Sequence, residues 1–275
     1  MPRVRIEMNS RPAFVIHTYG RRDAIISAAI AKYGSWDSAS TEIIRKLLEH
    51  DADFVDIGAN IGWFTLVAAH ALGRRGRVHS FEPDPRHVAK IRAAVRQSNF
   101  DNVIVNAWAL ADRAGEERLY RSETNFGDHR LFDLDEPRRS VKVAVKTLDE
   151  YTQIDATRPL VIKLDTQGSE ARILNGAQRT LTTHRAEIVL LCEAAPRLLS
   201  AAGSSLDELV ARLRALGFLA ALVDHQRAML QPITWERFVR QAMDGSAAQP
   251  NYESDLLLFR RPDGLVAPVL KFGRE

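Results

Sequence analysis

The stretch Phe54-Val55-Asp56-Ile57-Gly58-Ala59-Asn60-Ile61-Gly62-Trp63-Phe64-Thr65 joins a short apolar run to a second apolar segment that continues to Leu72. The pattern predicts a buried strand, a tight turn and a helix. Gly58 and Gly62 allow the turn and leave room where a side chain would block a ligand. The first N–H groups of a helix lack backbone partners and carry the positive end of its dipole, so this turn is a candidate seat for an anion.

A second predicted strand, residues 77–81, follows about twenty residues later and is succeeded by Glu82. Open α/β sheets bind ligands beyond the carboxyl ends of their strands, and an acidic residue there can accept hydrogen bonds from ribose hydroxyls. The two segments together predict a nucleotide-like cofactor. The other interpretation is an ordinary strand–turn–helix of an α/β protein, in which the glycines serve only the turn.

The glycine spacing narrows the choice of cofactor. The dinucleotide fingerprint is Gly-x-Gly-x-x-Gly, and counted from Gly58 its second and third glycines are replaced by Asn60 and Trp63. This departure argues against NAD and against an oxidoreductase. S-adenosylmethionine remains a candidate, because its carboxylate could bind at the helix N-terminus and its ribose hydroxyls could donate to an acidic side chain.

Length and composition indicate a globular protein. The chain has 275 residues, 45% hydrophobic and 27% charged, enough for one large domain with a sizeable core and an N-terminal extension. Its net charge is +3, and the basic residues are interleaved with acids, so we expect no nucleic-acid partner. We expect a cytoplasmic protein without a membrane partner, because no apolar run could span a bilayer. No His/Asp/Glu set has metal-ligand spacing, and no metal is expected.

The order of predicted elements is that of a mostly parallel α/β sheet with a helical extension, residues 1–50, before the main domain, residues 51–275. The extension contains helices 23–32 and 41–49, the second capped by Ser40. Further helices are predicted over 85–97, capped by Asp84, and over 169–182. The final strand, 255–259, lacks a crossover helix and is expected to be antiparallel. The irregular segments 122–139 and 226–251 are candidate sources of specificity.

Four ordered motifs carry a family resemblance: Asp56-Ile57-Gly58-Ala59-Asn60-Ile61-Gly62, Phe81-Glu82-Pro83, Asn106-x-x-Ala109-Leu110 and Ile162-Lys163-Leu164-Asp165-x-Gln167-Gly168-x-Glu170. They resemble those of the FkbM-type methyltransferases, best over residues 52–193. The resemblance implies a class I methyltransferase fold with seven strands, the last antiparallel, and helices on both faces. It also implies S-adenosylmethionine as cofactor and methylation of hydroxyl groups, often on secondary metabolites or sugars.

The resemblance also implies which residues bind the cofactor. Those at the turn would surround the methionine moiety: Asp56, Gly58, Ala59, Asn60 and Gly62. Glu82 would hold the ribose, Asn106 and Ala109 would border the adenine, and Asp165 would face the reactive end. Gln167 stands where many relatives carry Glu, which changes the charge next to Asp165.

Methyl transfer to an alcohol requires alignment of the acceptor and removal of a proton. Asp165 and Glu193, each at a predicted strand end, are candidate catalytic residues, although Asp165 is better suited to orientation and Glu193 could simply close its strand. His129 is a third candidate because histidine titrates near neutrality; the alternative is a solvated loop histidine.

We therefore expect an S-adenosylmethionine-dependent O-methyltransferase acting on a small molecule. An N-methyltransferase on the same scaffold and a non-catalytic module that binds adenosyl ligands are the alternatives. The sequence does not identify the acceptor or the oligomeric state.

Overall fold

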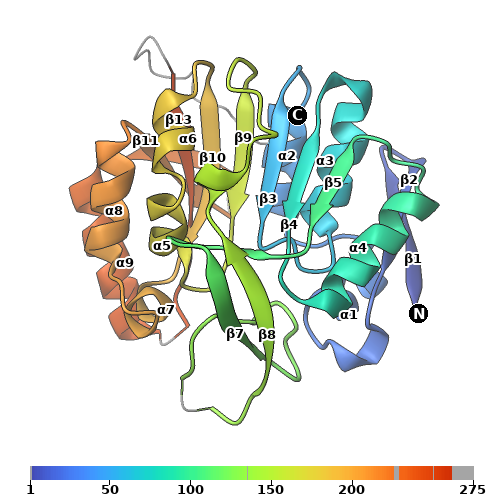
Figure 1. Ribbon diagram of the computed structural model, residues 1–275, viewed down its shortest axis with the longest axis horizontal. Coiled ribbons are helices and arrows are strands. Elements are labelled where there is room, and N and C mark those ends of the chain that lie inside the picture. The colour runs from blue at the N-terminus through green and yellow to red at the C-terminus, as the bar shows by residue number, and fades with distance from the viewer. Residues whose placement is uncertain (1, 135, 226–228, 250, 262–275) are drawn as a thin grey trace. The chain divides into compact units, whose positions relative to one another are not determined.

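The computed structural model describes residues 2–134, 136–225, 229–249 and 251–261 (Figure 1). The chain divides into two compact units. Unit 1 comprises Met1–Ala109 and Gly115–Val145, and unit 2 comprises Leu110–Ala114 and Lys146–Glu275. The predicted boundary after residue 50 falls inside unit 1.

The centre of unit 1 is a run of three parallel strands, β3 (Asp53–Ile57), β4 (Val78–Phe81) and β5 (Val103–Asn106). Ile57 pairs with Phe81, which in turn pairs with Asn106, so the three strands end in register. Gly58 and Glu82 therefore leave the sheet at the same edge. This arrangement confirms the predicted strand ends around the glycine turn.

Two helices connect these strands, α3 (Trp63–Leu72) and α4 (Pro85–Gln97). Nearly every residue of α3 is buried, because the sheet packs on one side of it and β2 and α2 pack on others. The predicted start of α4 is confirmed: Asp84 accepts a hydrogen bond from the Arg86 N–H at 2.8 Å, and Pro85 occupies the first turn.

The first fifty residues contain the two helices that we predicted, but they are not a purely helical extension. They begin with an antiparallel hairpin, β1 (Arg3–Met8) and β2 (Arg11–His17), and continue with α1 (Ile26–Tyr33) and α2 (Ser38–Leu47). The hairpin buries Ile6, Phe14 and Ile16, and β2 packs on α4. The predicted cap of α2 was wrong: Asp37 accepts from the Ser40 N–H at 3.2 Å, so Ser40 lies inside the helix.

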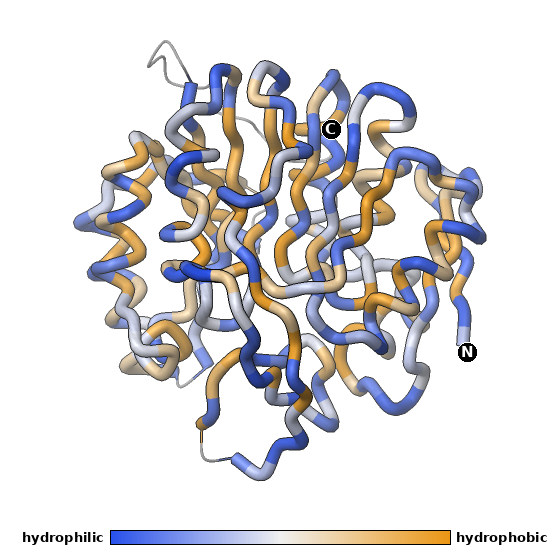
Figure 2. The backbone as a smooth tube through the Cα atoms, in the orientation of Figure 1, coloured by the Kyte–Doolittle hydropathy of each residue, from blue (hydrophilic) through white to orange (hydrophobic). Residues whose placement is uncertain are grey.

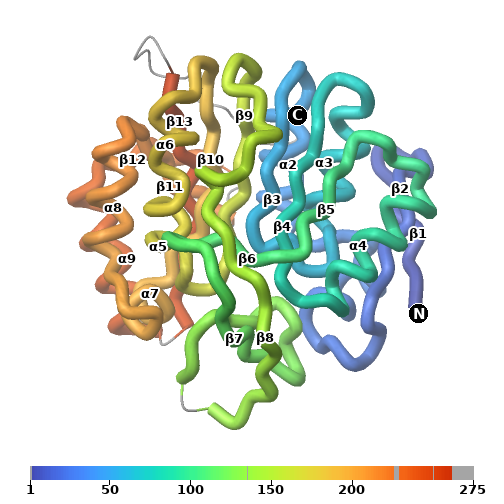
Figure 3. Tube along the Cα trace, viewed as in Figure 1, coloured from blue at the N-terminus to red at the C-terminus, as the bar shows by residue number. Residues whose placement is uncertain are grey.

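Unit 1 also contains a hairpin arm, β7 (Gly115–Arg121) with β8 (Arg139–Lys146), of which only Lys146 belongs to unit 2. The short strand β6 (Ala109–Leu110) precedes the arm and lies at the unit boundary. Figure 3 follows the loop that joins β7 to β8. That loop folds back on the arm, because the backbones of Tyr120 and Arg130 exchange hydrogen bonds of 2.8 and 3.0 Å. The segment 122–139, which we predicted to be irregular, is thus anchored to its own arm.

Unit 2 contains five strands in the order β12-β11-β13-β10-β9. Their bounds are β9 (Leu160–Leu164), β10 (Ile188–Ala194), β11 (Leu219–Asp224), β12 (Met229–Ile233) and β13 (Ser254–Arg260). β9 and β10 are parallel, whereas β13 is antiparallel to both β10 and β11, which confirms the predicted orientation of the last strand. We predicted seven strands, but the described residues give three central strands in unit 1 and five in unit 2. The additional strand is β12, which lies within the segment predicted to be irregular, 226–251, and pairs with β11.

The helices of unit 2 are α5 (Glu170–Asn175), α6 (Gln178–Thr183), α7 (Pro196–Ala201), α8 (Leu206–Ala215) and α9 (Trp235–Ala248). The single helix predicted over 169–182 is broken into α5 and α6 at Gly176. A Cβ at Gly176 would lie 1.9 Å from the Ala111 carbonyl oxygen, and the Gly176 carbonyl accepts from the Asp149 N–H at 2.8 Å. Close backbone contacts therefore take the chain out of the helix here. The described residues also form three single-turn 3₁₀ helices: Gly20–Arg22, Gly73–Arg75 and Leu148–Glu150.

Both units are α/β in character, and their central strands are mostly apolar (Figure 2). β3, β4 and β9 are buried along their whole lengths. No helix within the described part of the chain is both long and apolar enough to cross a bilayer.

Candidate functional site

The turn after β3 has the backbone geometry that its sequence predicts. Gly58, Asn60 and Gly62 all have positive φ angles, +85°, +52° and +90°. Glycine and asparagine are the residues that tolerate this region best. The N–H groups of Gly58 and Ala59 both donate to the Phe81 carbonyl at 3.1 Å, which ties the turn to the end of β4. Gly62 then begins α3 and has no side chain to cap its first turn.

Glu82 leaves β4 directly beside this turn and is only 5% exposed. Its Oε2 accepts from the Asn60 N–H and its Oε1 from the Asp84 N–H, both at 2.8 Å. Its own N–H donates to the Asn106 carbonyl at 3.1 Å. A carboxylate has about four acceptor positions. Two remain after these bonds, the number that a pair of ribose hydroxyls requires.

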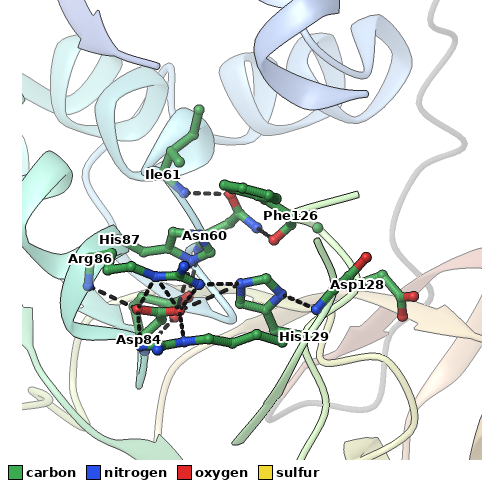
Figure 4. Close-up of polar contacts among 12 residues, drawn as sticks. Asn60, Ile61, Asp84, Arg86, His87, Phe126, Asp128 and His129 are labelled. Carbon is green, nitrogen blue, oxygen red and sulfur yellow. Dashed lines mark hydrogen bonds and ion pairs between the residues drawn. The ribbon is translucent and has the colours of Figure 1, made fainter. Parts of the chain in front are cut away.

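The side chain of Asn60 is engaged by the protein itself. Its Nδ2 donates to the Phe126 carbonyl at 2.7 Å, and its Oδ1 accepts from the Ile61 N–H at 2.7 Å (Figure 4). Phe126 belongs to the loop of the hairpin arm, and its N–H points to Asp23 Oδ1 at 3.5 Å. Asn60 therefore holds that loop on the glycine turn, and direct contact of its side chain with a cofactor stays a prediction.

Four further residues that the sequence assigned to the cofactor are buried: Asp56, Ala59, Asn106 and Ala109. Asp56 is 1% exposed, and its carboxylate accepts from the Thr65 hydroxyl at 2.5 Å, so its side chain joins β3 to α3. Ala59 and Ala109 are each 5% exposed. Asn106, 3% exposed, has an Nδ2 group with no hydrogen-bond partner among the described residues. An unpaired buried amide next to the strand ends fits a residue that contacts a ligand base.

Asp84 is the centre of a charged cluster that the sequence analysis did not predict (Figure 4). Its carboxylate is fully buried and accepts two 2.8 Å hydrogen bonds from Arg121, as well as one from Arg86 Nη2. His129 Nε2 lies 3.4 Å from Asp84 Oδ2. Burial alone would raise the pKa of Asp84, but hydrogen bonds from His129, Arg86 and Arg121 hold this pKa far below its ordinary value. The sequence marked Asp84 only as a helix cap, because its partners come from a distant hairpin.

His129 is not the solvated loop residue considered above. Its side chain is 7% exposed, and its Nδ1 accepts from the Ser122 N–H at 3.3 Å. Nε2 lies 3.3 Å from Arg86 Nη2 and 3.4 Å from Asp84 Oδ2. Burial lowers the pKa of His129. With both nitrogens engaged, the ring positions the loop on α4, and a role as catalytic base stays a prediction.

Asp84, His87 and His129 each bring one potential ligand atom within 4.8 Å of the others. Two observations disfavour a metal ion there. The imidazoles of His87 and His129 are stacked, with 14° between their planes, so their in-plane lone pairs run parallel and do not converge. The Asp84 carboxylate is also neutralised by two guanidinium groups, which would repel a cation.

In unit 2, Asp165 directly follows β9, and Glu193 lies near the end of the neighbouring strand β10. Gln167 bridges the two carboxylates. The Gln167 Nε2 donates to Asp165 Oδ1 at 3.1 Å and to Glu193 Oε1 at 2.8 Å. Lys163, 3% exposed, donates to the other oxygen of Asp165 at 2.9 Å. Gln167 itself has a φ of +56°. The structure thus brings together the two predicted carboxylates and shows that the unusual Gln167 supplies donors to both.

The electrostatics of this pair differ from those of Asp84. Burial, followed by the charges of Asp165, Glu253 and Asp255, raises the pKa of Glu193 well above its ordinary value. A carboxylate with a raised pKa is a stronger base once ionised. A role for Glu193 as the group that accepts a proton stays a prediction.

Comparison with solved structures gives low identities. Methyltransferase FkbM from Methylobacillus flagellatus KT is 16% identical with a TM-score of 0.48, and the match covers 76% of this chain but 44% of that one. The chain thus spans less than half the length of that protein. A Streptococcus mutans protein solved in complex with SAH is 13% identical (TM-score 0.45; 80% and 94% covered). An S-adenosylmethionine-dependent O-methyltransferase from Thermotoga maritima is 10% identical (TM-score 0.43; 84% and 69% covered).

None of the curated proteins compared with the chain matches it. Residues 56–220, however, match the Methyltransferase FkbM domain, and these residues make up more than half of the chain. The match begins at Asp56 and includes the glycine turn, Glu82, Asn106, Asp165 and Glu193. Because of this match, the chain is assigned to the FkbM family of S-adenosylmethionine-dependent methyltransferases.

Proposed function

We propose that the protein transfers the methyl group of S-adenosylmethionine to an oxygen atom of a small metabolite, sugar or natural product. The observation that carries the cofactor assignment is the Glu82 carboxylate, which is fixed by the N–H groups of Asn60 and Asp84 and keeps two acceptor positions. The preference for oxygen rests on the resemblance to the family.

The residues of unit 1 fit such a cofactor. Glu82 would accept hydrogen bonds from the ribose hydroxyls, and the unpaired Nδ2 of Asn106 would donate to the adenine. The uncapped first turn of α3 after Gly62 would attract the carboxylate. When bound, S-adenosylmethionine supplies an electrophilic methyl group, and the protein contributes binding and orientation.

The residues of unit 2 fit the handling of a proton. An alcohol loses its proton when it accepts a methyl group, and Glu193 is the candidate that receives it. Gln167 holds the Glu193 carboxyl group in place, and Lys163 compensates the charge of Asp165. Asp165 is thereby suited to orient an acceptor hydroxyl group.

The test is incubation of the purified protein with S-adenosylmethionine and two acceptor panels, one of alcohols and sugars and one of amines. The reaction is followed by formation of S-adenosylhomocysteine and by mass spectrometry of the product. A methyl ether is the expected product. An N-methylated product would replace the O-methyltransferase proposal with its nearest alternative. Binding of S-adenosylhomocysteine without turnover of either panel would favour a non-catalytic adenosyl-binding module.

A further inference from the structure

His87 lies in the first turn of α4 and is almost completely buried, with a side-chain exposure of 1%. Neither of its ring nitrogens makes a hydrogen bond among the residues that the structure describes. Its Nδ1 lies 3.4 Å from Glu82 Oε1 but is not aligned for a hydrogen bond. Buried polar groups without partners destabilise a fold and call for an explanation.

The ring of His87 is held firmly on several sides. It stacks on His129 at a centroid distance of 4.9 Å, and Tyr19 meets it edge-on at 5.6 Å. Phe126 lies 6.5 Å away in a tilted arrangement. Tyr19 follows β2, whereas Phe126 and His129 belong to the loop of the hairpin arm (Figure 4), and together the three rings fix the plane of the imidazole.

Packing alone does not account for a histidine here. A phenylalanine would offer the same aromatic contacts without two desolvated nitrogens. Metal ligation is disfavoured by the parallel stacking with His129. The remaining role for the imidazole is a hydrogen bond to a group that binds next to Glu82.

We propose that His87 is a cofactor-binding residue that hydrogen-bonds a ribose hydroxyl together with Glu82. This inference rests on the proposed function, since it takes the cofactor to be an adenosyl compound. The chemistry of the two side chains is complementary. A hydroxyl group donates one hydrogen bond and accepts others. Ionised Glu82 can only accept from it, and the Nδ1–H of His87 can donate to its oxygen.

Tyr19, which packs against His87, also supports a bound ligand. The Tyr19 hydroxyl is also buried without a hydrogen-bond partner among the described residues. Its ring is held by Lys90, whose Nζ lies 3.9 Å from the ring centroid and donates to the Thr18 carbonyl at 2.7 Å. Two neighbouring rings therefore carry unpaired polar groups, and one of these rings, His87, lies beside Glu82, as expected of a site completed by a polar ligand.

The experiment is a calorimetric titration of S-adenosylhomocysteine into the wild type and the His87→Phe variant, with thermal unfolding of both ligand-free proteins. His87→Phe keeps the stacked ring and removes both nitrogens. We expect the variant to bind roughly tenfold more weakly, the effect of one lost hydrogen bond. We also expect an unchanged or higher Tm, because the unpaired nitrogens are gone. Equal affinity for the two proteins would overturn the inference.

His87→Asn keeps a side-chain N–H near the Nδ1 position, so we expect it to bind more tightly than His87→Phe even if it is less stable. If both variants bind equally weakly, the polar role is wrong. The 2′-deoxy and 3′-deoxy forms of S-adenosylhomocysteine locate the contact. The difference in affinity between the wild type and His87→Phe should disappear with one of these two analogues. A difference that persists with both analogues would contradict a ribose contact.

A matched control is His70→Phe, the same substitution at an exposed histidine of α3. It should leave the affinity for S-adenosylhomocysteine unchanged. The outcomes separate the two proposals. A folded wild type that binds no adenosyl ligand would overturn the proposed function and this inference with it. A wild type that binds tightly, with His87→Phe equal to it, would overturn the inference alone.

Discussion

The Glu82 carboxylate accepts a hydrogen bond from the backbone N–H of Asn60, with 2.8 Å between Oε2 and the nitrogen. This bond joins the turn after β3 to the acid after β4, two features separated by 22 residues. Its geometry depends on the left-handed backbone of Asn60. The glycine turn, which is the candidate anion site, and Glu82, the candidate acceptor for ribose hydroxyls, are therefore held together by a direct hydrogen bond.

Replacement of Asn60 by alanine should destabilise the protein by about 2 kcal/mol, measured as the free energy of unfolding in urea. The variant loses the hydrogen bond to the Phe126 carbonyl and places alanine at a φ of +52°. Asn99 is a matched control, because it is exposed and has a φ of +54°. Asn99→Ala should show only the backbone cost, about 1 kcal/mol. Equal losses for the two variants would mean that the Asn60 side chain contributes nothing.

Replacement of Asp84 by asparagine should cost about 2–3 kcal/mol, because Arg86 and Arg121 lose their counterion. This is below the value for a fully buried pair, since the Arg86 side chain is 43% exposed. Asp112→Asn removes the partner of Arg172 in a more exposed pair and should cost less than about 1 kcal/mol. If both variants lose the same small amount, the Asp84 cluster is not the stabilising element that its burial indicates.

Asp84 also predicts a pH dependence. Its pKa is held below the ordinary value of 3.8, so its stabilising contribution is present above that pH and is lost as the pH falls further. Urea midpoints measured from pH 6 down to pH 3 should therefore fall more steeply for the wild type than for Asp84→Asn. Parallel curves for the two proteins would contradict this.

For Glu193 we expect the stability of the fold to depend on pH in the opposite direction. Its pKa is raised above the ordinary value of 4.5, so the folded state is disfavoured as the pH rises from that value through the raised pKa. Glu193→Gln imitates the protonated carboxyl group and should raise the Tm at pH 8 but not at pH 4. If Glu193 is the base, the same variant should lose roughly a hundredfold or more in turnover. A Tm that falls at pH 8 would show that the carboxylate is stabilised in the fold.

Much of the fold could be predicted because its signals are local. The apolar run before Gly58 and the Asp84-Pro85 start of α4 determine their own conformations, and both predictions were confirmed. The failures depend on distant contacts. The break at Gly176 is set by the backbone of Ala111, and β12 forms only because it pairs with β11.

The same distinction applies to the site. The position of Glu82 beside the glycine turn could be predicted from its spacing, and the structure shows that contact. The positions of His87, Arg121 and Phe126 could not be predicted, because the hairpin loop reaches α4 and the turn only in the folded chain. The signal in the sequence was a polar loop, 122–139, without any indication of its partner.

The central claim is that an adenosyl cofactor binds at the glycine turn and Glu82. Calorimetric titration of S-adenosylhomocysteine and of NAD into the wild type and Glu82→Gln tests it most directly. We predict that the wild type binds S-adenosylhomocysteine and not NAD, and that Glu82→Gln binds it roughly 10- to 100-fold more weakly, because a charged acceptor of the ribose hydroxyls is lost. A folded wild type that binds no S-adenosylhomocysteine, or a Glu82→Gln variant with undiminished affinity, would contradict the claim.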